Sequence, residues 1–112
     1  MLSLAHITFD CADAAALAGF WSQALRRPVD DGANEYFATI DAAAPGPTFM
    51  FLRVDEDKTG KNRCHVDLTA ADRDAEVQRL LGLGATYEAD HDEYGHRWTV
   101  LRDPSGNEFC VA

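Results

Sequence analysis

Two segments of this chain resemble each other closely enough to indicate an internal repeat. Residues 5–16 read AHITFDCADAAA, and residues 64–75, lying 59 positions later, read CHVDLTAADRDA. The alignment pairs His6 with His65 and Asp13 with Asp72. A repeat of this kind restricts the fold more than composition does, because it predicts two similar structural units in the 112 residues.

Each repeat is predicted to begin with a strand and a helix. After each His, polar and apolar residues alternate, which is typical of a strand with one buried face. Asp13 and Asp72 then precede segments whose large apolar residues recur every three or four positions, so each is predicted to cap a helix. The first helix should end before Pro28, and the second should end at Gly82 and Gly84.

Further strands are expected after each helix, because runs of strand-forming residues are separated by turn residues there. These runs cover residues 35–41, 48–54, 85–89, 97–102 and 107–111, and Pro28 with Val29 is expected to open one further short strand. The pattern predicts an α+β fold with two βαβββ modules in a pseudo-two-fold arrangement. The polar residues that alternate with the apolar ones on each first strand predict a solvated concavity on the face away from the helices.

The modules are expected to share one core, because neither is large enough to bury a helix and a sheet alone. The whole chain, residues 1–112, is therefore predicted to be a single domain. Module 1 should span about residues 1–54 and module 2 about residues 63–112. Residues 55–62, DEDKTGKN, are charged and contain a glycine, so they are predicted to be the linker.

Composition excludes several classes of partner. Ten Lys and Arg against nineteen Asp and Glu give a formal charge of -9, which disfavours nucleic acid and anionic membranes. No apolar run approaches the ~20 residues of a transmembrane helix, and residues 1–10 lack a secretory signal, so a cytoplasmic location is expected. Cys11, Cys64 and Cys110 form no CxxC pair and are expected to be reduced and buried.

The paired modules, the His that opens each one and a late DPSGN turn resemble the vicinal oxygen chelate superfamily. That superfamily includes glyoxalase I, bleomycin-resistance proteins and extradiol dioxygenases. Residues 65–85, HVDLTAADRDAEVQRLLGLGA, and residues 98–111, WTVLRDPSGNEFCV, are most similar to small glyoxalase-like proteins. The resemblance covers nearly the whole chain.

The resemblance implies a curved mixed sheet around a concave site on its open face. In metal-dependent members a His and a carboxylate from each module hold a divalent ion, and His6 and His65 stand at the two His positions. The carboxylate positions align with Phe51 and Cys110, neither of which is a carboxylate. Glu108 lies two residues before Cys110 on the same strand face. The expected metal ligands are therefore His6, His65 and Glu108, with Cys110 as the alternative third donor.

The same strand also supplies the candidate catalytic residue. Glu108 is a candidate general base, because apolar walls would raise its pKa, although it may equally pair with Arg102 or Arg53. The Cys110 thiol is expected to stay protonated beside that carboxylate. The ligand-binding candidates are Phe51, Trp98, Thr8, Asp67 and Cys110. His91 and His96 flank a Gly-containing loop between two expected strands and could reach over the pocket mouth, although a hydrated loop is the commoner explanation.

Two classes of function remain open. The first is a binding protein of the bleomycin-resistance type, which holds a small, partly aromatic molecule, and loss of both carboxylates favours it. The second is a metal-dependent lyase, isomerase or dioxygenase, and retention of His6 and His65 favours it. The cofactor is then zinc, nickel, iron or manganese, and in the first class there is none. By analogy with the superfamily, the partners are a small molecule and a second copy in a homodimer.

Overall fold

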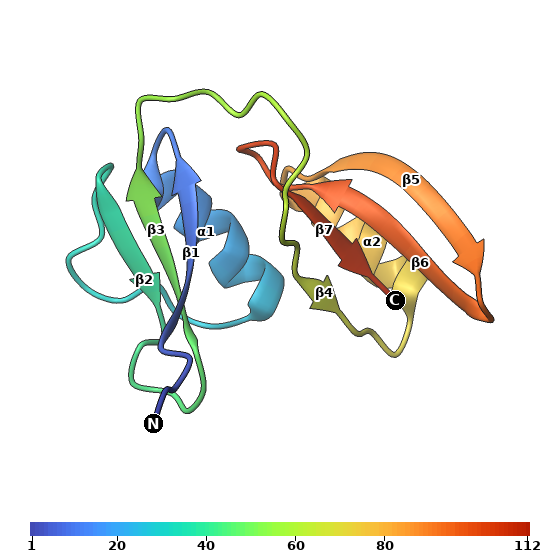
Figure 1. Ribbon diagram of the computed structural model, residues 1–112, viewed down its shortest axis with the longest axis horizontal. Coiled ribbons are helices and arrows are strands. Elements are labelled where there is room, and N and C mark those ends of the chain that lie inside the picture. The colour runs from blue at the N-terminus through green and yellow to red at the C-terminus, as the bar shows by residue number, and fades with distance from the viewer. The chain divides into compact units, whose positions relative to one another are not determined.

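Both repeats fold as a strand followed by a helix in the computed structural model, which describes residues 1–112 (Figure 1). β1 (His6–Cys11) leads into α1 (Ala14–Leu25), and β4 (Asp67–Leu68) leads into α2 (Arg73–Leu83). The Asp before each helix accepts a hydrogen bond from a backbone N–H in the first turn. The two predicted N-caps are confirmed. The order of strand and helix that each repeat predicts is confirmed as well.

Both helices end in the regions that the sequence predicts, before Pro28 and at Gly84. α1 ends at Leu25, and Arg26 takes a left-handed conformation with φ of 55° before Pro28. α2 continues through Gly82 and ends at Leu83, so the first of the two predicted glycines does not stop the helix. Gly84 is the cap instead, because its φ of 120° is a conformation that side chains with a Cβ rarely adopt.

The chain divides into two compact units, Met1–Asp57 and Lys58–Ala112. This division falls inside the predicted linker. The first unit holds β1, α1, β2 (Phe37–Ile40) and β3 (Thr48–Arg53), and its sheet has the order β1-β3-β2. The extra strand expected at Val29 is reduced to a single bridge to Ile40.

The second unit has a similar strand arrangement with a fourth strand added at one edge. After α2 come β5 (Thr86–Glu93), β6 (His96–Arg102) and β7 (Glu108–Val111), and the sheet order is β4-β7-β6-β5. In each unit the first strand pairs in parallel with the last strand, and the remaining pairs are antiparallel. β5 forms one edge of its sheet and carries a bulge between Tyr87 and Ala89. The mixed α+β class is confirmed, while the shared core, the pseudo-two-fold axis and the curled sheet stay predictions.

An aromatic cluster forms the core of the first unit. Trp21 of α1 is fully buried and stacks on Phe9 of β1 with ring centroids 5.3 Å apart. Phe9 in turn stacks on Phe51 of β3 at 5.4 Å, and Phe49 contacts the same two rings, Phe9 and Trp21. The side chains of β1 that face α1 therefore alternate with exposed His6 and the other polar residues, as the sequence predicts.

Phe51 lies on the opposite face from the one expected. Its side chain is completely buried and belongs to the cluster under α1. Its neighbour Leu52 is exposed, because successive side chains along a strand point to opposite faces. The expectation that Phe51 projects into the open side of the sheet is therefore wrong. Aromatic packing against Phe9 is what holds it inside.

In the second unit α2 covers one face of the sheet, as Figure 1 shows. Val77 and Leu80 are the buried residues of α2, and the fully buried Leu101, Phe109 and Val111 come from β6 and β7. The other face of this sheet is left for the side chains that alternate with them. Neither α1 nor α2 combines the length and apolar character that crossing a membrane requires.

Candidate functional site

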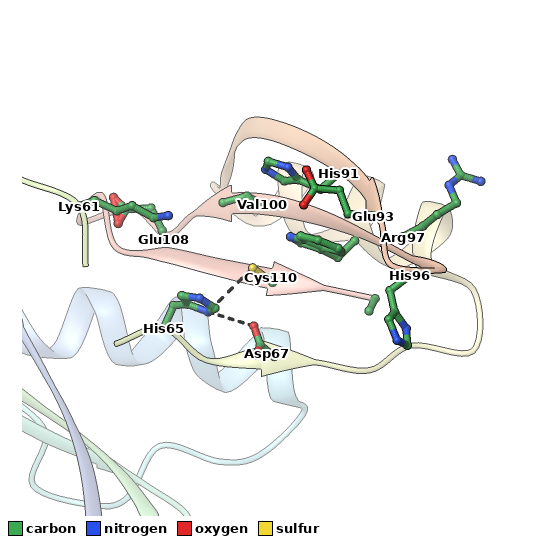
Figure 2. A pocket seen from close by; sticks show the side chains of 12 residues that line it. Lys61, His65, Asp67, His91, Glu93, His96, Arg97, Val100, Glu108 and Cys110 are labelled. Atoms are coloured by element: carbon green, nitrogen blue, oxygen red, sulfur yellow. Dashed lines mark hydrogen bonds and ion pairs between the residues drawn. The ribbon is translucent and has the colours of Figure 1, made fainter. Parts of the chain in front are cut away.

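The open face of the second sheet carries a pocket of about 590 Å³ (Figure 2). Trp98 and Val100 of β6 and Cys110 of β7 line it, each alternating with residues that face α2. The full lining comprises Lys61, His65, Asp67, His91, Glu93, His96, Arg97, Trp98, Val100, Glu108, Cys110 and Ala112. Three residues that the sequence selects for ligand binding, Asp67, Trp98 and Cys110, thus come together in one unit.

Three chemically active side chains meet at one side of this pocket. His65 Nδ1 lies 3.0 Å from Asp67 Oδ1 and 3.9 Å from Cys110 Sγ (Figure 2). The backbone explains their proximity, because Asp67 of β4 and Cys110 of β7 are direct partners in the parallel register. His65 stands two residues before Asp67 and so reaches the same side of the chain. The sequence predicts each of these residues as a site residue separately. The contact between His65 and Asp67 is a new observation.

The Cys110 thiol is protonated at neutral pH. Burial, together with the neighbouring Asp67 carboxylate, raises the pKa of Cys110 to about 11. The expectation of a protonated thiol is confirmed, although the responsible carboxylate is Asp67 rather than Glu108. A thiol with this pKa is a poor nucleophile. The expectation that all three cysteines are buried is wrong for Cys64, which is exposed, while Cys11 and Cys110 are buried.

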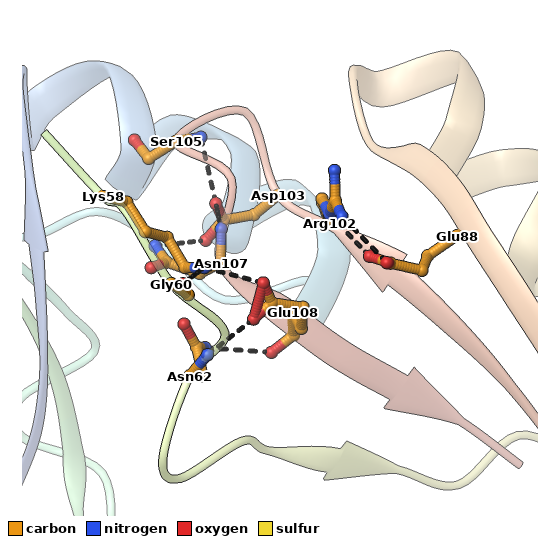
Figure 3. Close-up of polar contacts among 9 residues, drawn as sticks. All are labelled: Lys58, Gly60, Asn62, Glu88, Arg102, Asp103, Ser105, Asn107 and Glu108. Atoms are coloured by element: carbon orange, nitrogen blue, oxygen red, sulfur yellow. Dashed lines mark hydrogen bonds and ion pairs between the residues drawn. The ribbon is translucent and has the colours of Figure 1, made fainter.

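Glu108 is bound by Lys58 and Asn62, two residues of the segment that the sequence predicts to be a linker (Figure 3). Its side chain is buried, its Oε1 lies 2.7 Å from Lys58 Nζ, and its Oε2 accepts a 2.8 Å hydrogen bond from the backbone N–H of Asn62. The Asn62 side chain also donates to the Glu108 carbonyl at 3.2 Å. Arg102 and Arg53, the two partners proposed from the sequence, contact other groups: Arg102 pairs with Glu88, and the Arg53 guanidinium lies over the Tyr36 ring. Nothing in the sequence near Glu108 signals Lys58 or Asn62.

These contacts reverse the expected shift of the Glu108 carboxyl. Burial alone would raise its pKa, but the Asn62 N–H and the Lys58 ammonium together lower it below the ordinary value. The prediction of a raised pKa is therefore wrong. With both oxygens engaged and the carboxylate form stabilised, the geometry gives no support to a general base at this position.

The lowered pKa predicts an acid-sensitive contribution to stability. Because the folded state favours ionised Glu108, its contribution is present above the ordinary value of 4.5 and is lost as pH falls through the lower pKa of the folded state. Urea unfolding of the wild type and of Glu108→Gln at pH 7 and at pH 3 checks this. The stability difference between the two proteins should be clear at pH 7 and shrink at pH 3. An equal difference at both pH values would contradict it.

The DPSGN turn sets the start of β7 and so the position of Glu108 (Figure 3). Asp103 is almost fully buried, and its carboxylate accepts hydrogen bonds from the backbone N–H groups of Ser105 and Asn107. The Asn107 side chain adds a third bond at 3.0 Å. Gly106 closes the turn with φ of 87°, which favours glycine. The predicted turn is confirmed, and β7 begins directly after it.

An aromatic wall forms another part of the pocket. Trp98 of β6 and His91 of β5 are cross-strand partners, and their rings stack with centroids 5.1 Å apart. His91 lies in β5 and His96 begins β6, so the two residues flank the turn between these strands, as the sequence predicts, and both line the pocket. Only Tyr94 and Gly95 form the turn between the strands. Cross-strand pairing explains the wall, because opposite residues on a sheet have their Cβ atoms about 5 Å apart.

The remaining candidates lie in the first unit. His6 and Thr8 are exposed on the polar face of β1. His6 belongs to Met1–Asp57 and His65 to Lys58–Ala112. Their convergence on one ion, and the roles of His6 and Thr8 in binding, stay predictions.

The donor set differs from the one that the resemblance implies. The donors that meet in the second unit are one imidazole, one carboxylate and one thiol, all within 4.8 Å of one another. Glu108, the carboxylate expected as a ligand, is instead bound to Lys58 and Asn62. A site that needs the Glu108 carboxylate does not fit this arrangement without breaking those contacts. A site built on His65, Asp67 and Cys110 does fit.

Comparison with known proteins agrees with this fold. Residues 6–112 match a family model described as a glyoxalase-like domain. A glyoxalase/bleomycin resistance protein/dioxygenase family enzyme from Burkholderia phytofirmans PsJN superposes with a TM-score of 0.81 at 18% identity, covering 98% of this chain and 97% of that one. No curated protein matches the chain.

Two further solved structures are similar over almost the whole chain. A mutant of the fosfomycin resistance protein FosX from Listeria monocytogenes, complexed with Mn(II) and 1S,2S-dihydroxypropylphosphonic acid, has a TM-score of 0.77 at 14% identity and covers 99% of this chain and 89% of its own. Lactoylglutathione lyase from Agrobacterium tumefaciens has a TM-score of 0.70 at 16% identity and covers 99% and 92%. At these identities the similarity establishes the fold.

Proposed function

This chain belongs to the glyoxalase-like domain family, and from that premise we propose that it is a binding protein of the bleomycin-resistance type. Its ligand is a small, partly aromatic molecule held on the open face of the second sheet. The observation that carries the proposal is the pocket of about 590 Å³ around the stacked Trp98 and His91 rings. A volume of this size suits a small molecule, and an aromatic wall with a few polar groups is typical of such sites.

The polar groups in the pocket fix what the ligand must offer. His65 and Asp67 are exposed and lie together at one side, so they can hydrogen-bond a polar substituent. Trp98 offers its ring face to a planar group. A protonated Cys110 and an engaged Glu108 support binding over catalysis, because neither presents a reactive nucleophile or base.

The Trp98 ring gives the proposal its test. A thermal-shift screen of small aromatic compounds, run on protein treated with a chelator, should find binders that also quench tryptophan fluorescence. Trp98→Ala should weaken ligand binding about tenfold or more. A tenfold change in affinity corresponds to ~1.4 kcal/mol, and loss of the aromatic contact together with its buried area can exceed this value. Tyr87→Ala is the matched control, because Tyr87 is an exposed aromatic of the same sheet outside the pocket. Equal weakening by both variants, or no binder at all, would refute the proposal.

The alternative is a metal-dependent lyase, isomerase or dioxygenase. The observation that favours it is the group of His65, Asp67 and Cys110, and the FosX relative, which was solved with Mn(II), supports it. In this alternative a bound ion would polarise a substrate oxygen, and the Trp98 wall would orient the substrate. Elemental analysis of protein purified without a tag separates the two functions. Stoichiometric metal favours the alternative, and its absence favours simple binding.

Two further properties are proposed: a cytoplasmic location, from the N-terminal sequence, and a homodimer, by analogy with the superfamily. Light scattering of the purified chain tests the second, because a dimer has twice the 12.3 kDa of one chain. A mass of one chain at micromolar concentration would exclude the dimer.

A further inference from the structure

The polar end of the pocket in the second unit determines whether a ligand must donate or accept a hydrogen bond. His65 and Asp67 both line this pocket, and His65 Nδ1 lies 3.0 Å from Asp67 Oδ1 (Figure 2). Resting on the proposed binding function, we propose that the ligand carries a hydroxyl group that donates a hydrogen bond to His65 Nε2. The ligand is then a phenol with an extended aromatic body.

The Asp67 carboxylate fixes the tautomer of the His65 ring. An ionised carboxylate has no proton to donate, so the contact requires the proton to lie on His65 Nδ1. The Cys110 thiol is the other neighbour of this nitrogen, with its sulfur at 3.9 Å. Sulfur is a weak hydrogen-bond partner, whereas a hydrogen bond to a carboxylate is charge-assisted and stronger. In its neutral form the ring therefore keeps its lone pair on Nε2, which can only accept a hydrogen bond.

This acceptor is accessible to a ligand. The His65 side chain is 40% exposed, and its hydrogen bonds within the chain are all made by Nδ1. Glu108, the other carboxylate at this end of the pocket, is engaged by Lys58 and Asn62. A ligand group that donates a hydrogen bond is therefore complementary to His65 Nε2. An ether oxygen in the same place has only lone pairs and would face the lone pair of the ring.

The strand order sets the distance between the hydroxyl group and the aromatic wall. Asp67 of β4 pairs with Cys110 of β7, and Cys110 pairs with Val100 of β6, the strand that also carries Trp98. Neighbouring strands lie ~5 Å apart, so β4 and β6 are separated by roughly 10 Å. Two joined aromatic rings span this distance from Trp98 to His65, whereas a single ring is too short. A pocket of about 590 Å³ has room for such a molecule.

Two probes that differ only in the donor test the proposal: 4-phenylphenol and 4-methoxybiphenyl. Each is titrated into the full chain after treatment with a chelator, and quenching of tryptophan fluorescence measures the affinity. 4-Phenylphenol should bind about fivefold more tightly, as expected for one net hydrogen bond. His65→Phe keeps a ring but removes the acceptor, so it should reduce this affinity ratio to about one. His65→Gln supplies a carbonyl acceptor and should recover part of the ratio.

Asp67 acts here as a positioning residue for His65, and the affinity ratio separates this role from a purely structural one. Asp67→Ala allows the His65 ring to carry its proton on either nitrogen. It should therefore lower the ratio while changing the affinity for 4-methoxybiphenyl by less than about twofold. Asp74→Ala is the matched control and should leave the ratio unchanged, because Asp74 is an exposed aspartate of the same unit outside the pocket. Circular dichroism establishes that each variant is folded.

The possible outcomes separate the hydroxyl proposal from the binding function on which it rests. Equal affinity of the wild type for the two probes, or a ratio that survives His65→Phe, would overturn the hydroxyl proposal and leave the binding function standing. Failure of both probes to bind, when the thermal-shift screen finds other aromatic binders, would do the same. If that screen finds no binder, both proposals are overturned.

Discussion

Phe51→Glu should unfold the protein instead of adding a metal ligand to it. The side chain is fully buried and stacks on Phe9 at 5.4 Å. Loss of a core aromatic ring costs about 3–5 kcal/mol, and an unpaired carboxylate in its place costs several kcal/mol more. Small domains have about 5–15 kcal/mol of stability in total. Far-UV circular dichroism and urea unfolding should show loss of cooperative folding.

The neighbouring position provides the control for this substitution. Leu52 is exposed on the opposite face of β3, so Leu52→Glu should change the free energy of unfolding by less than about 1 kcal/mol. The pair of variants adds the same carboxylate to adjacent positions of one strand. A cooperative transition for Phe51→Glu at the wild-type midpoint would show that Phe51 does not lie in the core.

Glu108→Ala should lower the free energy of unfolding by about 2–3 kcal/mol, because it removes the acceptor of the part-buried Asn62 N–H and the carboxylate partner of the Lys58 ammonium. The Glu108 side chain is 7% exposed and the Lys58 side chain is 26% exposed, so the lysine regains part of its hydration when the carboxylate is removed. The midpoint of urea unfolding at pH 7 measures the loss. The effect should exceed that of an ordinary surface pair several-fold.

Glu88→Ala is the matched control, because it removes a Glu from an ion pair of the same unit. Arg102 and Glu88 are 48% and 34% exposed, and such pairs contribute at most about 1 kcal/mol. A double mutant that lacks Lys58 and Glu108 should lose less than the sum of the single mutants, since the two share one interaction. Equal losses for Glu108→Ala and Glu88→Ala would disprove the structural role of Glu108.

The repeat predicted most of the fold because its signals are local. Asp13 and Asp72 each satisfy a backbone donor three residues later, and a cap of this kind is readable from a short window of sequence. The alternation around His65 likewise predicted that Asp67 shares its side of the strand. The family was identified from the same signals and is confirmed.

The face of β3 on which Phe51 lies could not be predicted from the local sequence. Residues 49–52 are Phe, Met, Phe and Leu, so the strand has no alternation of polar and apolar residues that would distinguish its two faces. Only the contact with Phe9 on another strand settles the question. A family alignment that is shifted by one residue along this strand therefore assigns the side chain to the opposite face of the sheet.

The environment of Glu108 depends on contacts between distant parts of the chain. Lys58 lies 50 residues before it and Asn62 lies 46 residues before it, in a charged stretch that locally reads as solvated linker. Apolar neighbours such as Phe109 suggested a raised pKa, because local sequence shows burial but not the groups that compensate for it. Charge compensation of this kind is a tertiary property.

The edge strand β5 has a consequence for the behaviour of the chain at high concentration. It pairs only with β6, so its other side presents unpaired backbone N–H and C=O groups that another strand could extend. Glu88, Asp90, Asp92 and Glu93 lie along it, and the bulge after Tyr87 interrupts its regular ladder. Two copies that met at this edge would place carboxylates against carboxylates. We therefore expect β5 to resist edge-to-edge pairing between copies of the chain.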